Sequence, residues 1–299
     1  MNNFLKSTFH SKVFKVSLNG GFTCPNKDGT SGVGGCTFCS PSGSGDFAGD
    51  IEQSITEQFH TIKEKMRTKW PNSQYIAYFQ ANTNTYGSVD TLKNLYDEAL
   101  RADPNIVGLS IATRADALSE ATIDLLETYH QKTYLQVELG LQSIDEDTAK
   151  TINRGHDLKQ FDDAVNRLRS RGINVVVHII NGFPWEDKKQ MIKTIEHINA
   201  LDIQGVKIHM LHITKNTALA HEYLQKPFEL LDLHAYVDVV VEQIRRLHKN
   251  IVIQRVTGDA SKDDLIAPMW TLKKFVVMNE IDKLMRKKGL YQGDLLAIK

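Results

Sequence analysis

The sequence has few cysteines, no long apolar run and no excess of charge of either sign. Only three of its 299 residues are cysteines, and all three lie between positions 22 and 40. An odd, tightly clustered set argues against a disulfide framework and favours a reducing cytoplasm. No apolar run approaches membrane-spanning length, and the first residues lack the apolar core and cleavage site of a signal peptide. We therefore expect a cytoplasmic protein without a membrane partner.

Net charge does not indicate a class of partner either. Lys plus Arg total 36, and Asp plus Glu total 36, so the formal net charge is zero. A local basic patch remains compatible with this balance. The C-terminal region carries one, which fits either phosphate contact or a solvated helix face: Arg245, Arg246, Lys249, Lys273, Lys274, Lys283, Arg286, Lys287 and Lys288. No sequence pattern of an RRM, KH or OB module is apparent.

Hydrophobic periodicity predicts strands that alternate with helices. Six apolar segments read as strands, at residues 12–18, 75–80, 106–112, 134–141, 173–180 and 206–211, and a helical pattern follows each. The first of these helical patterns includes Ile51, Ile55 and Phe59. Ser88 and Asp157 are expected to cap later helices, and two further helices are expected to begin at Ser119 and Asp187. From about residue 227 the rhythm changes to a helix at 230–247, a short strand at 251–253 and a final helix at 269–288.

Near-continuous apolar strands indicate a parallel sheet covered by helices. Six units are two short of a closed eight-fold barrel, so the expected fold is α/β, a partial (βα)6 TIM-like barrel. A doubly wound open sheet is the alternative. The barrel is expected over residues 1–226, with a cysteine loop at 22–40. Residues 227–299 would form a C-terminal α/β extension packed on it.

The cysteine loop carries the chemistry. Cys36 and Cys39 are two residues apart, and eleven residues, many of them glycine, separate Cys24 from Cys36. A cubic iron–sulfur cluster normally takes four cysteines, so three thiolates would leave one iron open. A structural zinc ion would need a fourth ligand from elsewhere, because no His lies between Cys24 and Cys39. Unliganded thiols are the third possibility.

These residues resemble the signature of the radical S-adenosylmethionine (radical SAM) superfamily, in which an aromatic residue, here Phe38, precedes the last cysteine. The first gap is longer than the commonest form. The resemblance implies a [4Fe–4S] cluster whose open iron binds S-adenosylmethionine, and reductive cleavage that yields a 5'-deoxyadenosyl radical. The residues implied to be catalytic, as cluster ligands, are Cys24, Cys36 and Cys39. An electron donor such as flavodoxin or ferredoxin is implied as a partner.

Further segments are similar to the cofactor-binding parts of that family. Asn82, Thr83 and Asn84 occupy the place of the turn that binds the methionine amine, although the usual Gly-Gly-Glu is absent. The segment from Glu138 to Ser143 and the sequence Asn153-Arg154-Gly155-His156 resemble oxygen-independent coproporphyrinogen oxidase and the Elongator catalytic subunit. The implied roles place Gln142 and Ser143 at the ribose, Arg154 at the methionine carboxylate, and Glu138 and His178 in the pocket. No role is assigned to His209 or His212.

Longer segments resemble the YhcC/YtqA-like branch of the superfamily: residues 12–26, 34–39, 78–86 and 254–260. Members of the MnmL type in this branch are linked to wobble-uridine modification in transfer RNA, converting a carboxymethylaminomethyl side chain to aminomethyl. By that resemblance tRNA is the expected substrate. The same chemistry on a small metabolite or peptide, and a zinc-stabilised binding protein without catalysis, remain alternatives.

Overall fold

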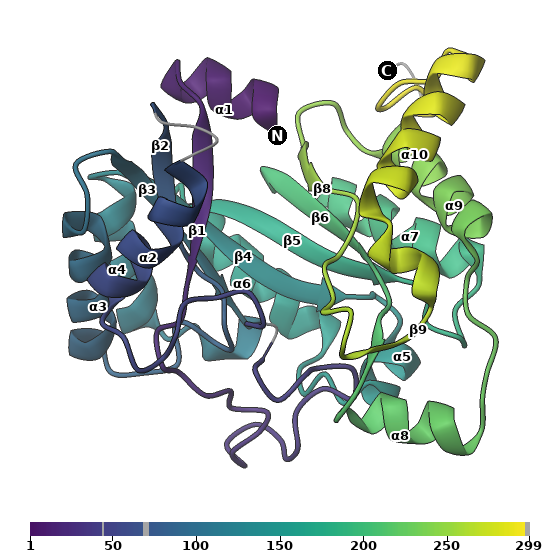
Figure 1. The fold of residues 1–299 in the computed structure, drawn as a ribbon, viewed down its shortest axis with the longest axis horizontal. Helices are drawn as coiled ribbons and strands as arrows, with labels where there is room; N and C mark the ends of the chain where they lie inside the picture. The colour runs from purple at the N-terminus through teal and green to yellow at the C-terminus, as the bar shows by residue number, and fades with distance from the viewer. Residues whose placement is uncertain (44, 68–71, 297–299) are drawn as a thin grey trace. The chain divides into compact units, whose positions relative to one another are not determined.

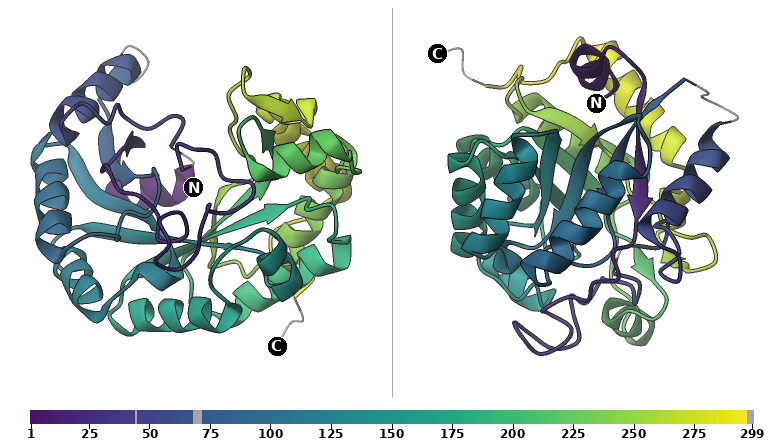
Figure 2. Two further views of the ribbon diagram at one scale, coloured as in Figure 1. Left: turned by 90° about the horizontal axis from the view of Figure 1, so that it is seen from below. Right: turned by 90° about the vertical axis from the view of Figure 1, so that its left-hand side faces the viewer.

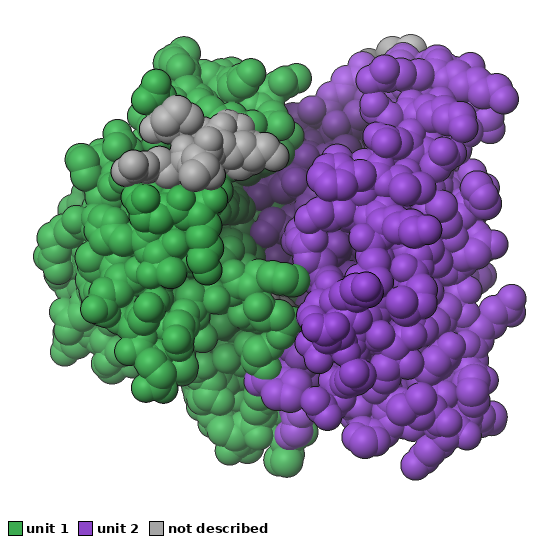
Figure 3. All heavy atoms as spheres, viewed as in Figure 1, with its two compact units in different colours: residues 1–33, 42–140, 163–176 green, residues 34–41, 141–162, 177–299 purple. Residues whose placement is uncertain are grey.

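The structure is a computed structural model that describes residues 1–43, 45–67 and 72–296. It consists of two compact units, which Figure 3 colours separately. Unit 1 comprises Met1–Val33, Ser42–Gly140 and Asp163–Val176. Unit 2 comprises Gly34–Pro41, Leu141–Asp162 and Val177–Lys299. Cys24 therefore belongs to unit 1, whereas Cys36 and Cys39 belong to unit 2.

The strands form a seven-stranded sheet in the order β1-β2-β3-β4-β5-β6-β8 (Figure 1). The pairs β1–β2, β2–β3, β3–β4 and β6–β8 are parallel, as the apolar strands predict. A separate antiparallel pair joins β7 to β9. The strands are β1 Val13–Leu18, β2 Gln74–Phe79, β3 Ile106–Thr113, β4 Tyr134–Gln142, β5 Asn174–Asn181, β6 Gly205–Met210, β7 Ile213–Thr214, β8 Val252–Arg255 and β9 Leu265–Ala267.

The helices that follow Ser88 and Asp157 have the predicted caps, and two further helices are capped in the same way. The side chains of Ser88, Ser119, Asp157 and Asp187 each accept a hydrogen bond from the backbone N–H three residues later. The α-helices are α1 Asn2–Phe9, α2 Ile55–Arg67, α3 Val89–Arg101, α4 Glu120–His130, α5 Glu146–Thr151, α6 Leu158–Ser170, α7 Lys188–Ala200, α8 Ala218–Gln225, α9 Leu233–Arg246 and α10 Lys274–Lys288. Short 3-10 helices span Ala115–Ala117 and Met269–Leu272.

In unit 1, helices α2, α3 and α4 lie along one face of the strands (Figures 1 and 2). Aromatic contacts join α2 and α3 to the sheet. Phe59 of α2 contacts Tyr75 of β2, and Tyr96 of α3 contacts Phe79 of β2, at ring-centroid distances of 5.5 and 5.2 Å. Successive strand side chains point to opposite faces, so Lys15, Tyr78 and other polar residues lie on the face away from these helices. Helix α1 packs on that face at its amino-terminal end, where Leu5 contacts Val13 and Ile76.

In unit 2, helix α9 lies on the face of β5 that carries Asn181, because Gln243 and Asn181 exchange hydrogen bonds of 2.8 and 2.9 Å through their side-chain amides. His178 of β5, an odd number of residues away, therefore points to the opposite face. Met210 of β6 lines a small apolar cavity together with Asn181 and Tyr236 of α9. Lys207 and His209 lie an odd number of residues before Met210 on β6, so they point to the face opposite this cavity, as His178 does.

Three local features differ from the sequence predictions. The helix expected to include Ile51 begins at Ile55, because Ser54 and Glu57 form a reciprocal cap in which each side chain bonds the other's backbone N–H at 3.2 and 2.8 Å. Ile51 lies before this cap and is 57% exposed. Helices α1 and α5 were not predicted. The short strand expected at 251–253 joins the main sheet as β8, next to β6.

Among the residues that the structure describes, no helix is long and apolar enough to cross a membrane.

Candidate functional site

The turn from Cys36 to Cys39 is held by other segments of unit 2. The N–H of Cys39 donates to the carbonyl of Cys36 at 3.0 Å, which closes the turn. The N–H of Thr37 donates to the carbonyl of Ile152, and the N–H of Leu219 donates to the carbonyl of Thr37, both at 2.9 Å. The Asn153 amide donates to the carbonyl of Gly35 at 2.8 Å. The turn's backbone is therefore fixed by two other segments of the unit.

An apolar cluster backs this turn. Phe38 packs against a buried group of side chains from unit 2: Ile152, Phe183, Leu211, Ile213, Leu219 and Ala220. Its ring centroid lies 6.2 Å from that of Phe183, which in turn stacks on Trp185 at 5.7 Å. Phe38 thus anchors the turn by packing.

Cys24 begins a tight turn in unit 1. Its carbonyl accepts hydrogen bonds from the N–H groups of Lys27 at 2.8 Å and Asp28 at 3.3 Å. The preceding residue, Thr23, accepts from the N–H of Thr83 at 3.3 Å. The Lys27 ammonium donates to the side-chain oxygen of Asn82 at 3.2 Å. The first cysteine is therefore held against the polar turn that follows β2.

That polar turn contains all three residues predicted to meet the methionine amine. Asn82 has φ 57° and donates its N–H to the carbonyl of Gly43 at 2.9 Å. A Cβ on Gly43 would lie 1.9 Å from the Asn82 side-chain oxygen, so only glycine fits there. Thr83 is buried. The Asn84 amide nitrogen donates to the carbonyls of Phe79 at 3.2 Å and Ala112 at 2.9 Å.

The side-chain oxygen of Asn84 is left as a hydrogen-bond acceptor. Its Oδ1 is buried and accepts no hydrogen bond from the described residues, although a buried amide oxygen normally has a donor. An ammonium group is a donor that suits this atom. The predicted role of Asn82, Thr83 and Asn84 stays a prediction, and Asn84 is the member of the set with acceptor capacity to spare.

Glu138 lies at the centre of a buried polar network in unit 1. Its side chain is fully buried, and its Oε1 accepts from the Lys15 ammonium at 2.6 Å, the Ser110 hydroxyl at 2.5 Å and the Gln136 amide at 2.8 Å. Its Oε2 accepts from the Tyr78 hydroxyl at 3.1 Å. Four strands thus contribute one donor each, and the carboxylate is neutralised by the ammonium. Its predicted place in the cofactor pocket stays a prediction.

The partners of Glu138 were not predicted from the sequence. They are Lys15, Tyr78, Ser110 and Gln136. A signal was present, because these are polar residues inside otherwise apolar strands. Gln136 is two residues from Glu138, and Lys15 pairs in register with Ile76, two residues before Tyr78. A period of two places such residues on one face. Knowing which ones meet requires the register between strands, and the register is not visible in a single strand.

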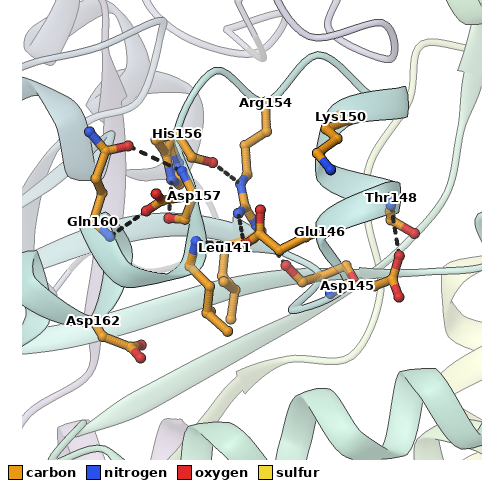
Figure 4. A network of polar contacts seen from close by, with 12 residues as sticks. Leu141, Asp145, Glu146, Thr148, Lys150, Arg154, His156, Asp157, Gln160 and Asp162 are labelled. Atoms are coloured by element: carbon orange, nitrogen blue, oxygen red, sulfur yellow. Dashed lines mark hydrogen bonds and ion pairs between the residues drawn. The ribbon is translucent and has the colours of Figure 1, made fainter.

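Arg154 organises the carboxyl end of β4 in unit 2 (Figure 4). The N–H of Ser143 donates to the carbonyl of Leu141 at 2.8 Å, and Gln142 between them has φ 65°, a left-handed conformation that is uncommon for Gln. The Arg154 Nη1 donates to both flanking carbonyls, of Leu141 at 2.9 Å and Ser143 at 2.7 Å. One guanidinium therefore stabilises the strained turn that presents Gln142.

The remaining nitrogens of Arg154 also have partners. Its Nε donates to the carbonyl of His156 at 2.8 Å, and its Nη2 lies 3.5 Å from the Glu146 carboxylate (Figure 4). Arg154 is 1% exposed, so these carbonyl and carboxylate oxygens replace water around its charge. The predicted contact of Arg154 with a carboxylate of the cofactor stays a prediction. Its positioning of Gln142 and Ser143 is a role that the sequence did not indicate.

Glu186 of unit 2 follows β5 and, like Glu138 of unit 1, is a buried carboxyl group. Burial raises its pKa, and the nearby Asp145 and Asp187 carboxylates add to the rise, while Ser143 and Thr148 partly offset it. Its Oε1 is buried and accepts no hydrogen bond from the part of the chain that the structure describes. Next to it, the Trp185 indole donates to the Thr148 hydroxyl at 3.0 Å.

His178, predicted to line the pocket, lies in β5 beside His209 of β6, with ring centroids 5.3 Å apart. Burial lowers the pKa of His209 well below its ordinary value, and the charges of His178, Arg255 and Lys207 lower it further. Burial together with Arg255 lowers the pKa of His212 to about 4. His209 and His212 are therefore neutral imidazoles at physiological pH.

The donor set suits a thiophilic metal centre. Cys24, Cys36 and Cys39 form no disulfide, and each of the three residues is partly exposed. Neither unit, over its described residues, contains by itself a group of three Cys, His, Asp or Glu side chains arranged to hold a metal ion. Thiolates are the ligands that iron–sulfur clusters require. The three thiols fit the cluster that the resemblance implies, and the unsatisfied amide oxygen of Asn84 fits the ammonium group of S-adenosylmethionine.

The chain matches two family models. The one described as "Radical SAM superfamily" covers residues 26–198, and the one described as "Radical_SAM C-terminal domain" covers residues 203–287. Two relatives match along almost the whole chain. The YtqA protein of Bacillus subtilis is 45% identical over 98% of this chain and 91% of its own length. The YhcC protein of Escherichia coli is 36% identical over 98% of this chain and 93% of its own length.

Among solved structures, the archaeal Elp3 of Methanocaldococcus infernus, with its N-terminal residues deleted, superposes with a TM-score of 0.71 at 18% identity. The match covers 94% of this chain and 64% of the Elp3 chain, so this chain spans less than two thirds of that protein. At this level of identity the likeness concerns the fold. Together with the parallel sheet and its helices, it confirms the predicted α/β partial-barrel class.

Proposed function

The chain belongs to the radical SAM superfamily, whose members use a [4Fe–4S] cluster and S-adenosylmethionine, and on this premise we propose that Cys24, Cys36 and Cys39 are its cluster ligands. The observation that carries the proposal is the fixed turn from Cys36 to Cys39. Backbone bonds from Thr37 to Ile152 and from Leu219 to Thr37 hold its conformation. A preorganised pair of thiols is what a ligand turn requires. Three ligands leave one iron for S-adenosylmethionine.

When bound, the cluster and S-adenosylmethionine supply a 5'-deoxyadenosyl radical that abstracts hydrogen from a substrate. The chain's own residues bind and orient. Asn84 offers a buried amide oxygen to the amine of the methionine moiety. Arg154 holds the turn that carries Gln142 and Ser143, the residues proposed to contact the ribose. Phe38 and Phe183 exclude water from the protein side of the ligand turn, which protects a reactive intermediate from side reactions.

The substrate we propose is tRNA, with conversion of the wobble-uridine carboxymethylaminomethyl side chain to aminomethyl. This rests on the resemblance of residues 12–26, 34–39, 78–86 and 254–260 to the YhcC/YtqA-like branch, in which members of the MnmL type are linked to this modification. The basic residues of α10 are suited to phosphate contact. Its last turn carries Arg286, Lys287 and Lys288. The same proposal includes a cytoplasmic location and a flavodoxin or ferredoxin as reductant. It also includes a barrel domain at residues 1–226 with an extension at 227–299.

The cluster assignment is tested by anaerobic reconstitution with iron and sulfide. The intact protein should turn brown, hold about four iron and four sulfide per chain, and form 5'-deoxyadenosine from S-adenosylmethionine with dithionite. Cys36→Ala should lose both properties and keep the far-ultraviolet circular dichroism of the parent. Ser31→Ala, an exposed position in the same loop, is the matched control and should retain both. Deoxyadenosine formation by Cys36→Ala would overturn the ligand assignment.

The substrate is tested separately. Modified nucleosides of bulk tRNA from cells with and without the gene should differ by accumulation of the carboxymethylaminomethyl form in its absence. Complementation with the parent gene should remove that form, and complementation with Cys36→Ala should not. Unchanged tRNA nucleosides, combined with normal deoxyadenosine formation in vitro, would reject the tRNA substrate while leaving the radical chemistry in place.

A further inference from the structure

Large apolar side chains that stay exposed are concentrated near the carboxyl end of the described chain. Ten such side chains are found among the described residues, and six of them lie between positions 269 and 295: Met269, Phe275, Val276, Met278, Tyr291 and Leu295. Most belong to α10 or directly flank it, and α10 packs on α9 within unit 2. Exposed apolar side chains that gather in one region mark interaction sites in soluble proteins. This end of unit 2 is therefore a candidate docking surface.

The charge of this region indicates the kind of partner. Residues 273–288 contain six Lys or Arg and two acidic residues, whereas the whole chain is neutral. Three of the six cations have a carboxylate partner: Lys274 with Asp259, Lys283 with Glu280, and Arg286 with Asp282. Lys273, Lys287 and Lys288 form no ion pair with the described residues, and Lys287 and Lys288 are exposed in the last turn of α10. An anionic partner would compensate these charges.

An exposed aromatic ring lies close to the end of α10. Tyr291 follows the helix by three residues and is 57% exposed. The Lys249 ammonium, from the loop between α9 and β8, lies 5.1 Å from the centre of its ring. The amide nitrogen of Gln292 donates to the carbonyls of His248 and Ile251 at 2.7 and 2.8 Å, which ties the two loops together. The ring and the ammonium are therefore held side by side on the surface.

The four residues Lys249, Lys287, Lys288 and Tyr291 are called the α10-end cluster below. All four are exposed, and three of them are cations without a carboxylate partner among the described residues. Proteins that bind unpaired RNA stack bases on aromatic rings and contact the neighbouring phosphates with Lys or Arg. A ring with an ammonium beside it provides both contacts for one nucleotide. RNA is therefore the partner that this chemistry fits.

Two other occupants fit less well. A second copy of the chain in a two-fold contact would set the cations of this surface against themselves. A helix that lies on an anionic membrane has its apolar and cationic residues on opposite faces. In α10 they lie in successive turns, with Phe275 and Met278 in the first two turns and the cations in the last, and Asp282 between them is 65% exposed.

We propose that the α10-end cluster docks the RNA at a point away from the reacting base. Tyr291 stacks on an unpaired base of an RNA loop, and Lys249, Lys287 and Lys288 contact the phosphates beside it. The proposal rests on the proposed function, which makes tRNA the substrate, and it adds the surface that holds the tRNA. Within unit 2, the last turn of α10 lies at the opposite end from α8, which is bonded to the ligand turn through Leu219 (Figure 1). The cluster therefore serves binding and not the radical chemistry.

The experiment measures the affinity of the reconstituted protein for a labelled, unmodified tRNA transcript at several salt concentrations. The double variant Lys287→Ala, Lys288→Ala should bind more weakly, and its slope of log affinity against log salt should fall by roughly 0.7–0.9 for each lost phosphate contact. Tyr291→Leu should weaken binding about five- to a hundredfold with little change of slope, the range for one stacked base. Tyr291→Phe keeps the ring and should keep the affinity.

The matched control is Lys132→Ala, an exposed lysine of unit 1, which should leave affinity and slope as in the parent. Iron content and far-ultraviolet circular dichroism equal to the parent show that each variant folds. Cations at the end of a helix also stabilise its dipole, so the melting temperature is measured as well. A lower melting temperature of the double variant with unchanged RNA affinity and slope would overturn the proposal. Full affinity of Tyr291→Leu would overturn the stacking contact.

Two further results separate the surface from other assignments. Vesicles of phosphatidylserine and phosphatidylcholine test the membrane: binding to them that the double variant loses, without loss of RNA affinity, would reject the RNA surface. Unchanged tRNA nucleosides in cells without the gene, with RNA binding that the variants weaken, would reject the modification and leave the surface in place. The expected nucleoside change, with variants that bind as the parent does, would reject the surface and leave the modification in place.

Discussion

The buried ion pair between Lys15 and Glu138 makes the sharpest prediction for stability. Glu138 has a side chain with no exposed area, whereas the side chain of Lys15 is 18% exposed, and their charged atoms are 2.6 Å apart. Breaking such a pair from one side leaves an uncompensated charge, and the size of the penalty depends on how far water reaches it. The two single substitutions should therefore have different costs.

Lys15→Met leaves the Glu138 carboxylate buried with three neutral donors, from Ser110, Gln136 and Tyr78, and should cost about 3–5 kcal/mol. Glu138→Gln leaves an ammonium that still reaches water, and should cost less, about 2–3 kcal/mol. The double variant carries no buried charge and should cost about 2–4 kcal/mol. The single costs therefore sum to more than the double, with a coupling energy of about 2–4 kcal/mol.

Urea unfolding of the four proteins, followed by far-ultraviolet circular dichroism and by tryptophan fluorescence, measures this cycle. Coincidence of the two probes is needed first, because a chain of two units can unfold in more than one step. Tyr78→Phe is the matched control: it removes the neutral hydroxyl that donates to Oε2 at 3.1 Å, leaves both charges in place and should cost about 1 kcal/mol. Additive single costs, with coupling below about 0.5 kcal/mol, would refute a buried, mutually dependent pair.

Three further predictions concern single groups in unit 2. His212 should titrate by NMR near its pKa of about 4. Because this pKa lies below the value for His in the unfolded chain, the unfolded chain binds the proton more readily, and stability is lost as the pH falls below about 6.5. His212→Gln should reduce that loss. A His212 signal titrating above pH 6 would contradict its burial. Glu186 has a raised pKa, so its ionised form is disfavoured in the folded chain and stability is lost as the pH rises through the carboxyl range. Glu186→Gln should therefore raise the urea midpoint more at about pH 8 than at about pH 4, and an equal change at both would argue against the shift. Gly258→Ala places a Cβ 2.5 Å from the His212 ring and should cost about 1–3 kcal/mol of unfolding free energy, with an unchanged urea midpoint as the contrary result.

Local signals predicted the framework well, because they act within a few residues. Ser88 and Asp157 were recognised as caps from their own side chains and the apolar positions that follow. The same rule applied to Ser54 and Glu57 would have excluded Ile51 from its helix. Helix α5 spans only Glu146–Thr151, too few residues to show an apolar period.

The site was harder to predict, since its contacts join segments far apart in the chain. Glu138 was recognised as an inward-facing carboxylate, but its ion pair with Lys15 spans more than a hundred residues and depends on the register of four strands. Arg154 was predicted from a resemblance to face a ligand. Its contacts with the carbonyls of Leu141 and Ser143 depend on the left-handed turn at Gln142, and that turn has no sequence signal because Gln seldom adopts it.

The anchoring of the turn from Cys36 to Cys39 has a consequence for the order of biogenesis. The carbonyl of Thr37 is bonded by the N–H of Leu219, and the N–H of Thr37 bonds the carbonyl of Ile152. These partners leave the ribosome long after the cysteines do. The two thiols therefore emerge early on a nascent chain that cannot yet shape them, and iron delivery during translation would meet a loose loop. The shape of the ligand turn is therefore complete only after residue 219 has been synthesised and has folded back onto it.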